Sequence, residues 1–109
     1  MGVEIQNYEP SGSGQKPEVG QTIEMHYRGK LTDGTEFDSS FKRNKTFKTK
    51  IGVGQVIKGW DEGVMQLEVG DKATLVCSSD YAYGKAGIPG VIPGGATLIF
   101  DVEFVSIIG

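Results

Sequence analysis

The sequence predicts an α+β domain, in which an antiparallel sheet with one apolar face carries a single short helix across that face. Apolar and polar residues alternate with a period of two over most of the chain, which is the pattern of half-buried strands. Residues 57–67 instead repeat their apolar side chains at helical spacing. Glycine accounts for 17 of the 109 residues without any period, which favours tight turns between short elements.

Six segments alternate well enough to be predicted as strands. In residues 22–31, Ile23, Met25 and Tyr27 point one way while the residues between them are polar or charged. Asp33-Gly34 then marks a hairpin turn. The first predicted strand is the weakest of the set and is expected at an edge of the sheet. The predicted strands are residues 3–8, 22–31, 35–39, 47–51, 72–77 and 97–104.

The predicted helix is defined by Trp60, Val64 and Leu67, which recur at the spacing i, i+4, i+7. Gly59 and Gly63 lie within it and give it a poor intrinsic propensity. We therefore expect packing against the sheet to hold this helix in place.

Composition excludes several classes of protein. A length of 109 residues suits one core, so a single domain is expected over residues 1–109. The formal net charge of -3 argues against a protein that binds nucleic acid or anionic membranes, because such proteins present a strongly basic face. Cys77 and His26 are the only residues of their types, which excludes a structural zinc site, a Cys/His protease and an intrachain disulfide. No metal or cofactor is expected.

The ends of the sequence match none of the common targeting patterns. No apolar run approaches the ~18 residues that a membrane-spanning helix needs. We therefore expect a cytoplasmic location, where a single free thiol is common, and a monomer that binds neither nucleic acid nor membranes.

Three possible catalytic patterns fail on inspection. Residues 54–59 have the glycine spacing of a phosphate-binding loop, but Trp60 stands where that loop needs a lysine. His26 is predicted on the polar face of its strand as a solvated side chain, which leaves no base for a nucleophile. Asp61 and Glu62 are adjacent on the predicted helix, so they point in different directions and are predicted to be solvated.

For two charged features, the sequence leaves two interpretations open. Asp38 follows Phe37, and alternation places one of the two on the apolar side. Asp38 is either a turn or edge aspartate, or a carboxylate among aromatic rings that takes hydrogen bonds from tyrosine hydroxyls and Arg43. Residues 42–50 hold five of the 11 positive charges, which form either a solvated surface or a patch that faces a partner.

Aromatic residues come from several separate elements and all fall on or beside the apolar side. They form either a plain core or, in part, the lining of an open cleft, because six large rings would overfill a small interior unless some of them line a cleft. The irregular residues 78–95 are also rich in apolar side chains, which is typical of a functional loop. The aromatic residues in question are Tyr27, Phe37, Phe47, Trp60, Tyr83 and Phe100.

Four motifs in order resemble the FKBP-type peptidyl-prolyl isomerases, the immunophilins that bind tacrolimus and rapamycin. The resemblance extends over residues 3–104 and implies a twisted antiparallel sheet wrapped around the short helix, with an apolar cleft between them. It implies catalysis of X–Pro rotation without covalent or metal chemistry. The motifs are FDSS at residues 37–40, VIKGWDEG at 56–63, YAYG at 81–84 and ATLIFDVE at 96–103.

The resemblance also implies a set of site residues. Trp60 would form the floor of the cleft, while the backbone N–H of Ile57 and the hydroxyl of Tyr83 would hold carbonyl groups. Asp38 would polarise the site, and Phe37, Asp38, Trp60 and Tyr83 would be catalytic. The residues expected to bind substrate or drug are Tyr27, Phe37, Asp38, Arg43, Phe47, Gln55, Val56, Ile57, Trp60, Ala82, Tyr83, Ile88, Val91, Ile92 and Phe100.

Partners follow from the same resemblance: proline-containing peptides and proteins, tacrolimus and rapamycin. A drug complex would engage calcineurin or the TOR kinase according to rim residues such as Ile88. Gln55 stands where many relatives carry an acidic residue, which places partner choice at the rim. The alternative is a regulatory binding module that acts on a receptor, channel, phosphatase or kinase through this rim. Ile88-Pro89 is itself an apolar–proline segment that could enter a neighbouring molecule's cleft.

Overall fold

The computed structural model describes residues 2–109, and within them six antiparallel strands form one sheet. The strand order is β1-β5-β6-β2-β3, and β4 pairs with β2 outside this path. One short helix, α1, accompanies the sheet, which confirms the predicted α+β class. The strands are β1 (Val3–Glu9), β2 (Thr22–Leu31), β3 (Glu36–Ser39), β4 (Phe47–Lys50), β5 (Lys72–Cys77) and β6 (Leu98–Ile107); the helix α1 is Lys58–Gly63.

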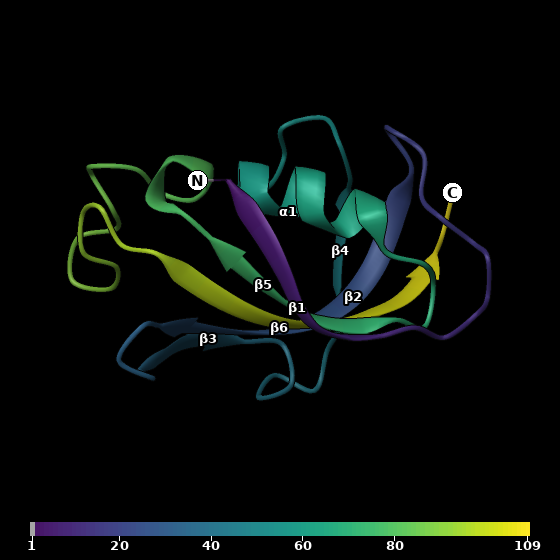
Figure 1. Ribbon diagram of the computed structural model, residues 1–109, viewed down its shortest axis with the longest axis horizontal. Helices are drawn as coiled ribbons and strands as arrows, with labels where there is room; N and C mark the ends of the chain where they lie inside the picture. The colour runs from purple at the N-terminus through teal and green to yellow at the C-terminus, as the bar shows by residue number, and fades with distance from the viewer. Residues whose placement is uncertain (1) are drawn as a thin grey trace.

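The helix lies across one side of the sheet, with β1 crossing beside it (Figure 1). Its two glycines allow this close approach. A Cβ atom on Gly59 would overlap the Sγ of Cys77, and a Cβ on Gly63 would lie 3.1 Å from a methyl group of Leu75. The glycines that weaken the isolated helix therefore permit the packing that stabilises it.

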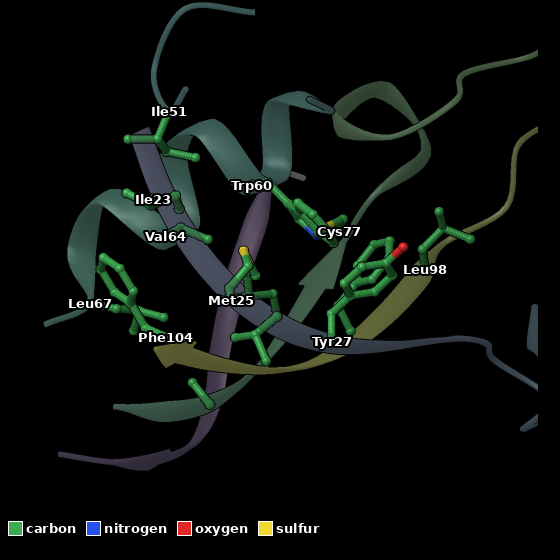
Figure 2. Packing of buried hydrophobic residues seen from close by; sticks show 14 of the residues in the cluster. Ile23, Met25, Tyr27, Ile51, Trp60, Val64, Leu67, Cys77, Leu98 and Phe104 are labelled. Carbon is green, nitrogen blue, oxygen red and sulfur yellow. The ribbon is translucent and has the colours of Figure 1, made fainter. Parts of the chain in front are cut away.

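The core fills the space between α1 and the sheet, where side chains from both point toward one another (Figure 2). The predicted alternation is confirmed for β2, β5 and β6, whose core-facing apolar residues are largely buried. Burial of each large apolar side chain stabilises the fold by about 1.5–3 kcal/mol. The buried apolar residues are Ile23, Met25, Tyr27, Ile51, Trp60, Val64, Leu67, Ala73, Leu75, Cys77, Ile92, Leu98, Phe100, Val102 and Phe104.

The predicted helix at residues 57–67 is longer than the observed one. The α-helix ends at Gly63 and continues as a 3₁₀ turn, Val64–Gln66. Leu67 then takes an extended conformation (φ -97°, ψ 163°) and is buried. The tighter turn keeps Val64 and Leu67 in the core while it ends the helix. Across residues 2–109, no helix combines the length and apolar character that a membrane crossing requires.

His26 lies on the outer side of β2, but it is not the solvated histidine that was predicted. It is half-buried, its Nδ1 lies 2.8 Å from the Oγ of Ser40, and its ring stacks on Phe41 at a centroid distance of 4.6 Å. The chain after β3 folds back over β2, because the buried Ser40 hydroxyl also accepts the backbone N–H of Tyr27 at 2.8 Å. Strand alternation alone gave no signal for this loop contact.

A candidate active site between the helix and the sheet

A cavity of about 480 Å³ opens beside α1, between the sheet and two loops. Its residues come from β2, β3, β4, β6, α1 and the loops before α1 and after β5. All of them except Gly54 belong to the set that the resemblance implied, and Gly54 has no side chain that could have signalled a role. The cavity is lined by Tyr27, Phe37, Asp38, Phe47, Gly54, Gln55, Val56, Ile57, Trp60, Ala82, Tyr83 and Phe100.

Trp60 lies at the base of the aromatic cluster and is only 5 % exposed. Its ring packs edge-to-face with Tyr27, Phe47 and Phe100 at centroid distances of 4.9, 5.7 and 5.1 Å. Its indole Nε1 is buried without a hydrogen-bond partner among residues 2–109. The rings therefore belong to the core on one side and line an open cavity on the other, so the two alternatives left open by the sequence both hold.

Phe37 and Asp38 both line the cavity, although strict alternation would turn one of them away. The strand register explains this. Gly29 pairs with Asp38 and Lys30 pairs with Glu36, which leaves Phe37 as an extra residue in β3. Such a β-bulge turns the strand locally and brings two successive side chains toward one side. Alternation fails at this point because of the bulge.

Asp38 is a carboxylate held among aromatic rings by several donors. Its Oδ2 accepts the hydroxyl of Tyr27, and its Oδ1 accepts Arg43 Nη1 at 2.5 Å and the Ser39 N–H at 2.8 Å. Arg43 Nη2 also donates to the Tyr27 oxygen at 3.0 Å. Burial alone would raise the pKa of Asp38, but the hydrogen bonds from Tyr27 and Arg43 and the charge of Arg43 outweigh it and hold that pKa below its ordinary value.

The polar groups of the cavity residues that make no hydrogen bond within residues 2–109 include two more donors besides the Trp60 indole. One is the backbone N–H of Ile57, the residue before α1, whose carbonyl accepts Trp60 N at 3.0 Å. The other is the hydroxyl of Tyr83. Burial, and then the charge of Asp38, raises the pKa of Tyr83, so its hydroxyl keeps its proton at neutral pH. Both groups can donate hydrogen bonds to a molecule in the cavity.

Asp61 fixes the loop that leads into the cavity and is not the solvated carboxylate that was predicted. Its two oxygens accept the backbone N–H groups of Gly52 and Gly54, each at 2.8 Å. Both glycines have positive φ, +82° and +80°, which other residues adopt poorly. The carboxylate thus holds the loop that carries Gln55, and the signal for it was the pair of glycines nine and seven residues upstream.

Four of the predicted site residues do not line the cavity. Arg43 contacts the cavity only indirectly, because it donates hydrogen bonds to Asp38 and Tyr27, which do line it. Ile88 and Ile92 pair with each other through two backbone hydrogen bonds of 2.8 Å, and Ile92 is buried in the core. Val91 is 48 % exposed. The last three belong to the loop after Tyr83, whose two sides are joined by the Ile88–Ile92 backbone pair.

Comparison with known proteins places this geometry in a family. The model for FKBP-type peptidyl-prolyl cis-trans isomerases matches residues 13–105. The chain is 57 % identical to FK506-binding protein 1A of Emericella nidulans and 55 % identical to peptidyl-prolyl cis-trans isomerase Fkbp12 of Drosophila melanogaster. Both matches run over 107 residues and cover 98 % of this chain and 99 % of the relative. The chain therefore belongs to the FKBP-type peptidyl-prolyl cis-trans isomerase family.

Proposed function

We propose that the cavity accelerates X–Pro rotation by holding the prolyl ring against the indole of Trp60, and that tacrolimus and rapamycin bind in the same place. The observation that carries this proposal is an open cavity of about 480 Å³ with an aromatic base and two hydrogen-bond donors that have no partner in residues 2–109. Membership of the isomerase family supports it.

The barrier to X–Pro rotation is about 18–20 kcal/mol and comes from amide resonance. Resonance makes the planar amide more dipolar than the twisted transition state. Water stabilises that dipole and apolar side chains do not, so transfer into the ring-lined cavity favours the twisted form. An acceleration of ~10⁴ requires about 5.5 kcal/mol of preferential transition-state stabilisation.

The polar groups of the cavity would hold the peptide while the amide rotates. The N–H of Ile57 and the hydroxyl of Tyr83 would donate to carbonyl groups on either side of the twisting bond. Asp38 stays charged and fixes the ring of Tyr27, which forms part of the wall. Rotation makes and breaks no covalent bond, so the step needs no nucleophile.

The experiment is a cis–trans isomerisation assay on a Leu-Pro peptide, with Phe37→Ala and Asp38→Ala as variants. We expect the wild-type chain to accelerate the reaction and both variants to lose at least tenfold in kcat/KM, about 1.4 kcal/mol. Tacrolimus should inhibit the reaction and change the fluorescence of Trp60 in the same concentration range. An absence of acceleration at micromolar protein would overturn the proposal.

A second role, as a binding module, is favoured by apolar side chains on the exposed loops. Val53 in the loop before α1 and Val91 in the loop after Tyr83 are 47 % and 48 % exposed. We propose that the two loops that carry Val53 and Val91 contact partner proteins. A drug-bound complex would present these loops to calcineurin or the TOR kinase. If Phe37→Ala abolishes isomerisation while partner capture survives, these two loops bind partners independently of catalysis.

A further inference from the structure

The side chain of Gln55 presents a hydrogen-bond donor at the edge of the cavity. Its Oε1 lies 3.3 Å from the backbone nitrogen of Lys50 and 3.4 Å from the Oγ1 of Thr49. A backbone N–H can only donate, so the Gln55 atom that faces it must be the oxygen. The amide nitrogen is then left without a partner among residues 2–109, and Gln55 lines the cavity.

The segment that leads into β4, together with β4 itself, is rich in positive charge, and only part of that charge is paired within residues 2–109. Residues 42–50 hold five basic residues and no acidic one, in a chain whose net charge is -3. Lys42 pairs with Glu36 at 2.7 Å and Arg43 pairs with Asp38. The remaining three are exposed and make no ion pair in residues 2–109; they are Lys45, Lys48 and Lys50.

The nearest acidic group on this strand pair is Glu24, which lies opposite Lys48 in the β2–β4 register. Its two oxygens accept the hydroxyls of Thr46 and Ser106. Glu24 makes no ion pair with Lys48 within residues 2–109, although the hydrogen bonds from Thr46 and Ser106, and then the charge of Lys48, help to lower the pKa of Glu24. Lys48 and Lys50 are exposed on the strand whose residue Phe47 lines the cavity, and the backbone of Lys50 contacts Gln55.

We propose that the β4 rim, defined here as Lys45, Lys48, Lys50 and Gln55, selects proline segments that carry an aspartate or glutamate next to the Leu-Pro unit. A carboxylate would accept a hydrogen bond from the Gln55 amide nitrogen and be attracted by the three lysines. This rests on the proposed function, and it adds a preference among substrates. The attraction should weaken with salt, because the Debye length is about 8 Å at physiological ionic strength.

Gln55→Glu is the sharpest variant, because the two side chains have the same shape. A glutamate oxygen can still accept the N–H of Lys50, while the second oxygen replaces the donor with a negatively charged acceptor. Lys48→Gln/Lys50→Gln removes two positive charges, while Gln55 and the backbone N–H of Lys50 that it accepts are unchanged. Its matched control is Lys16→Gln/Lys72→Gln, since Lys16 lies in the exposed loop before β2 and Lys72 lies in a separate groove on β5.

The substrates are Leu-Pro peptides with one glutamate at each of two positions on either side, each compared with the same peptide carrying glutamine. In the wild type, we expect at least one position to give a Glu/Gln ratio of kcat/KM of about three or more at low salt. Gln55→Glu should bring that ratio to one or below, and Lys48→Gln/Lys50→Gln should roughly halve it. The control pair should leave the ratio unchanged, and added salt should lower it.

A wild-type ratio of one or below at all four positions overturns the proposal, as does an equal loss of the ratio in the Lys16→Gln/Lys72→Gln control. Binding of the same peptides, followed by the fluorescence of Trp60, measures the ratio even if no peptide is isomerised. Failure to isomerise the glutamine peptides counts against the proposed function, whereas equal binding of both peptides counts against the acidic preference.

Discussion

Asp38 keeps its negative charge beside aromatic rings because its neighbours supply donors for both oxygens. The carboxylate, the Tyr27 hydroxyl and the Arg43 guanidinium form a closed triangle of hydrogen bonds. Because the pKa of Asp38 is lower in the folded than in the unfolded chain, its ionisation stabilises the fold above its ordinary pKa. That contribution is lost as the pH falls through the folded value.

Tyr27→Phe should open this triangle without changing the shape of the ring. We expect the free energy of unfolding near neutral pH to fall by about 1 kcal/mol, the usual contribution of such a hydrogen bond. The pKa of Asp38 should move up toward its ordinary value, so the acid-induced loss of stability should become shallower. Urea unfolding between about pH 7 and pH 3 measures both effects, and kcat/KM should fall several-fold.

Tyr8→Phe is the matched control, because the Tyr8 hydroxyl also donates to a carboxylate, that of Asp71, at 2.8 Å. It lies on β1, outside the cavity lining. This variant should leave kcat/KM unchanged. If the two variants lower kcat/KM equally, the Tyr27 hydroxyl has no special role in the site.

At the scale of the elements, the bulge in β3 depends on a glycine in β2. A Cβ atom on Gly29 would lie 2.6 Å from Cζ of Phe37 and 3.0 Å from Cε1 of Phe100. Both rings line the cavity. The absence of a side chain at position 29 therefore sets how closely the Phe37 ring lies on the sheet.

Gly29→Ala should push the Phe37 ring outward and change the cavity wall. We expect a loss of about 1–3 kcal/mol in unfolding free energy, as for other overpacked sites, together with a fall in kcat/KM. Gly29→Ala/Phe37→Leu should recover part of the stability but not the activity. Thermal unfolding and the isomerisation assay check this; additive stability effects in the double variant would contradict the contact.

The close packing of α1 against β5 leads to a second prediction at the scale of the elements. Gly59→Ala improves intrinsic helix propensity by ~1 kcal/mol, yet its Cβ would overlap the Sγ of Cys77. We expect a net loss of stability. Cys77→Ala should also destabilise the fold, because it leaves a cavity. The double variant should be more stable than the sum of the two losses, and a double-mutant cycle in urea measures that coupling.

Much of the element order could be predicted because one face of the sheet is buried, and burial of one face imposes alternation on β2, β5 and β6. The bulge at Phe37 could not be, since an extra residue shifts the register without changing composition. The role of Asp61 was missed for a different reason: its partners are backbone N–H groups, and the two upstream glycines were its only sequence signal. The cavity residues were identified from the family resemblance, because residues from four strands, the helix and two loops share no local pattern.

At the scale of the whole molecule, Asp71 ties the N-terminal region to the start of β5. This buried carboxylate accepts the Tyr8 hydroxyl and the backbone N–H groups of Ser11 and Glu68 at 2.7–2.8 Å. Burial alone would raise the pKa of Asp71, but these hydrogen bonds outweigh it and lower that pKa. Its ionisation therefore stabilises the fold above its ordinary pKa and ceases to do so as the pH falls.

Asp71→Asn should replace one of the two accepting oxygens with an NH₂ group, so that at least one of the three donors loses its acceptor. We expect the free energy of unfolding near neutral pH to fall by about 1–3 kcal/mol, and the acid limb of the stability profile to flatten. Asp33→Asn is the control: its carboxylate also has a lowered pKa, chiefly through the backbone N–H of Thr35, but its partners all lie within one turn of the chain. Equal losses of unfolding free energy in the two variants would show that the long-range hydrogen bonds of Asp71 contribute no more than a local turn.

The place of β6 in the sheet has a consequence for synthesis. β6 pairs with both β5 and β2, which do not pair with each other. Because β6 follows every other strand along the chain, the two halves of the sheet stay unjoined while the ribosome is still making it. Until β6 has left the ribosome and paired, the edges of β5 and β2 that it covers stay unpaired, and unpaired strand edges are prone to associate with other chains.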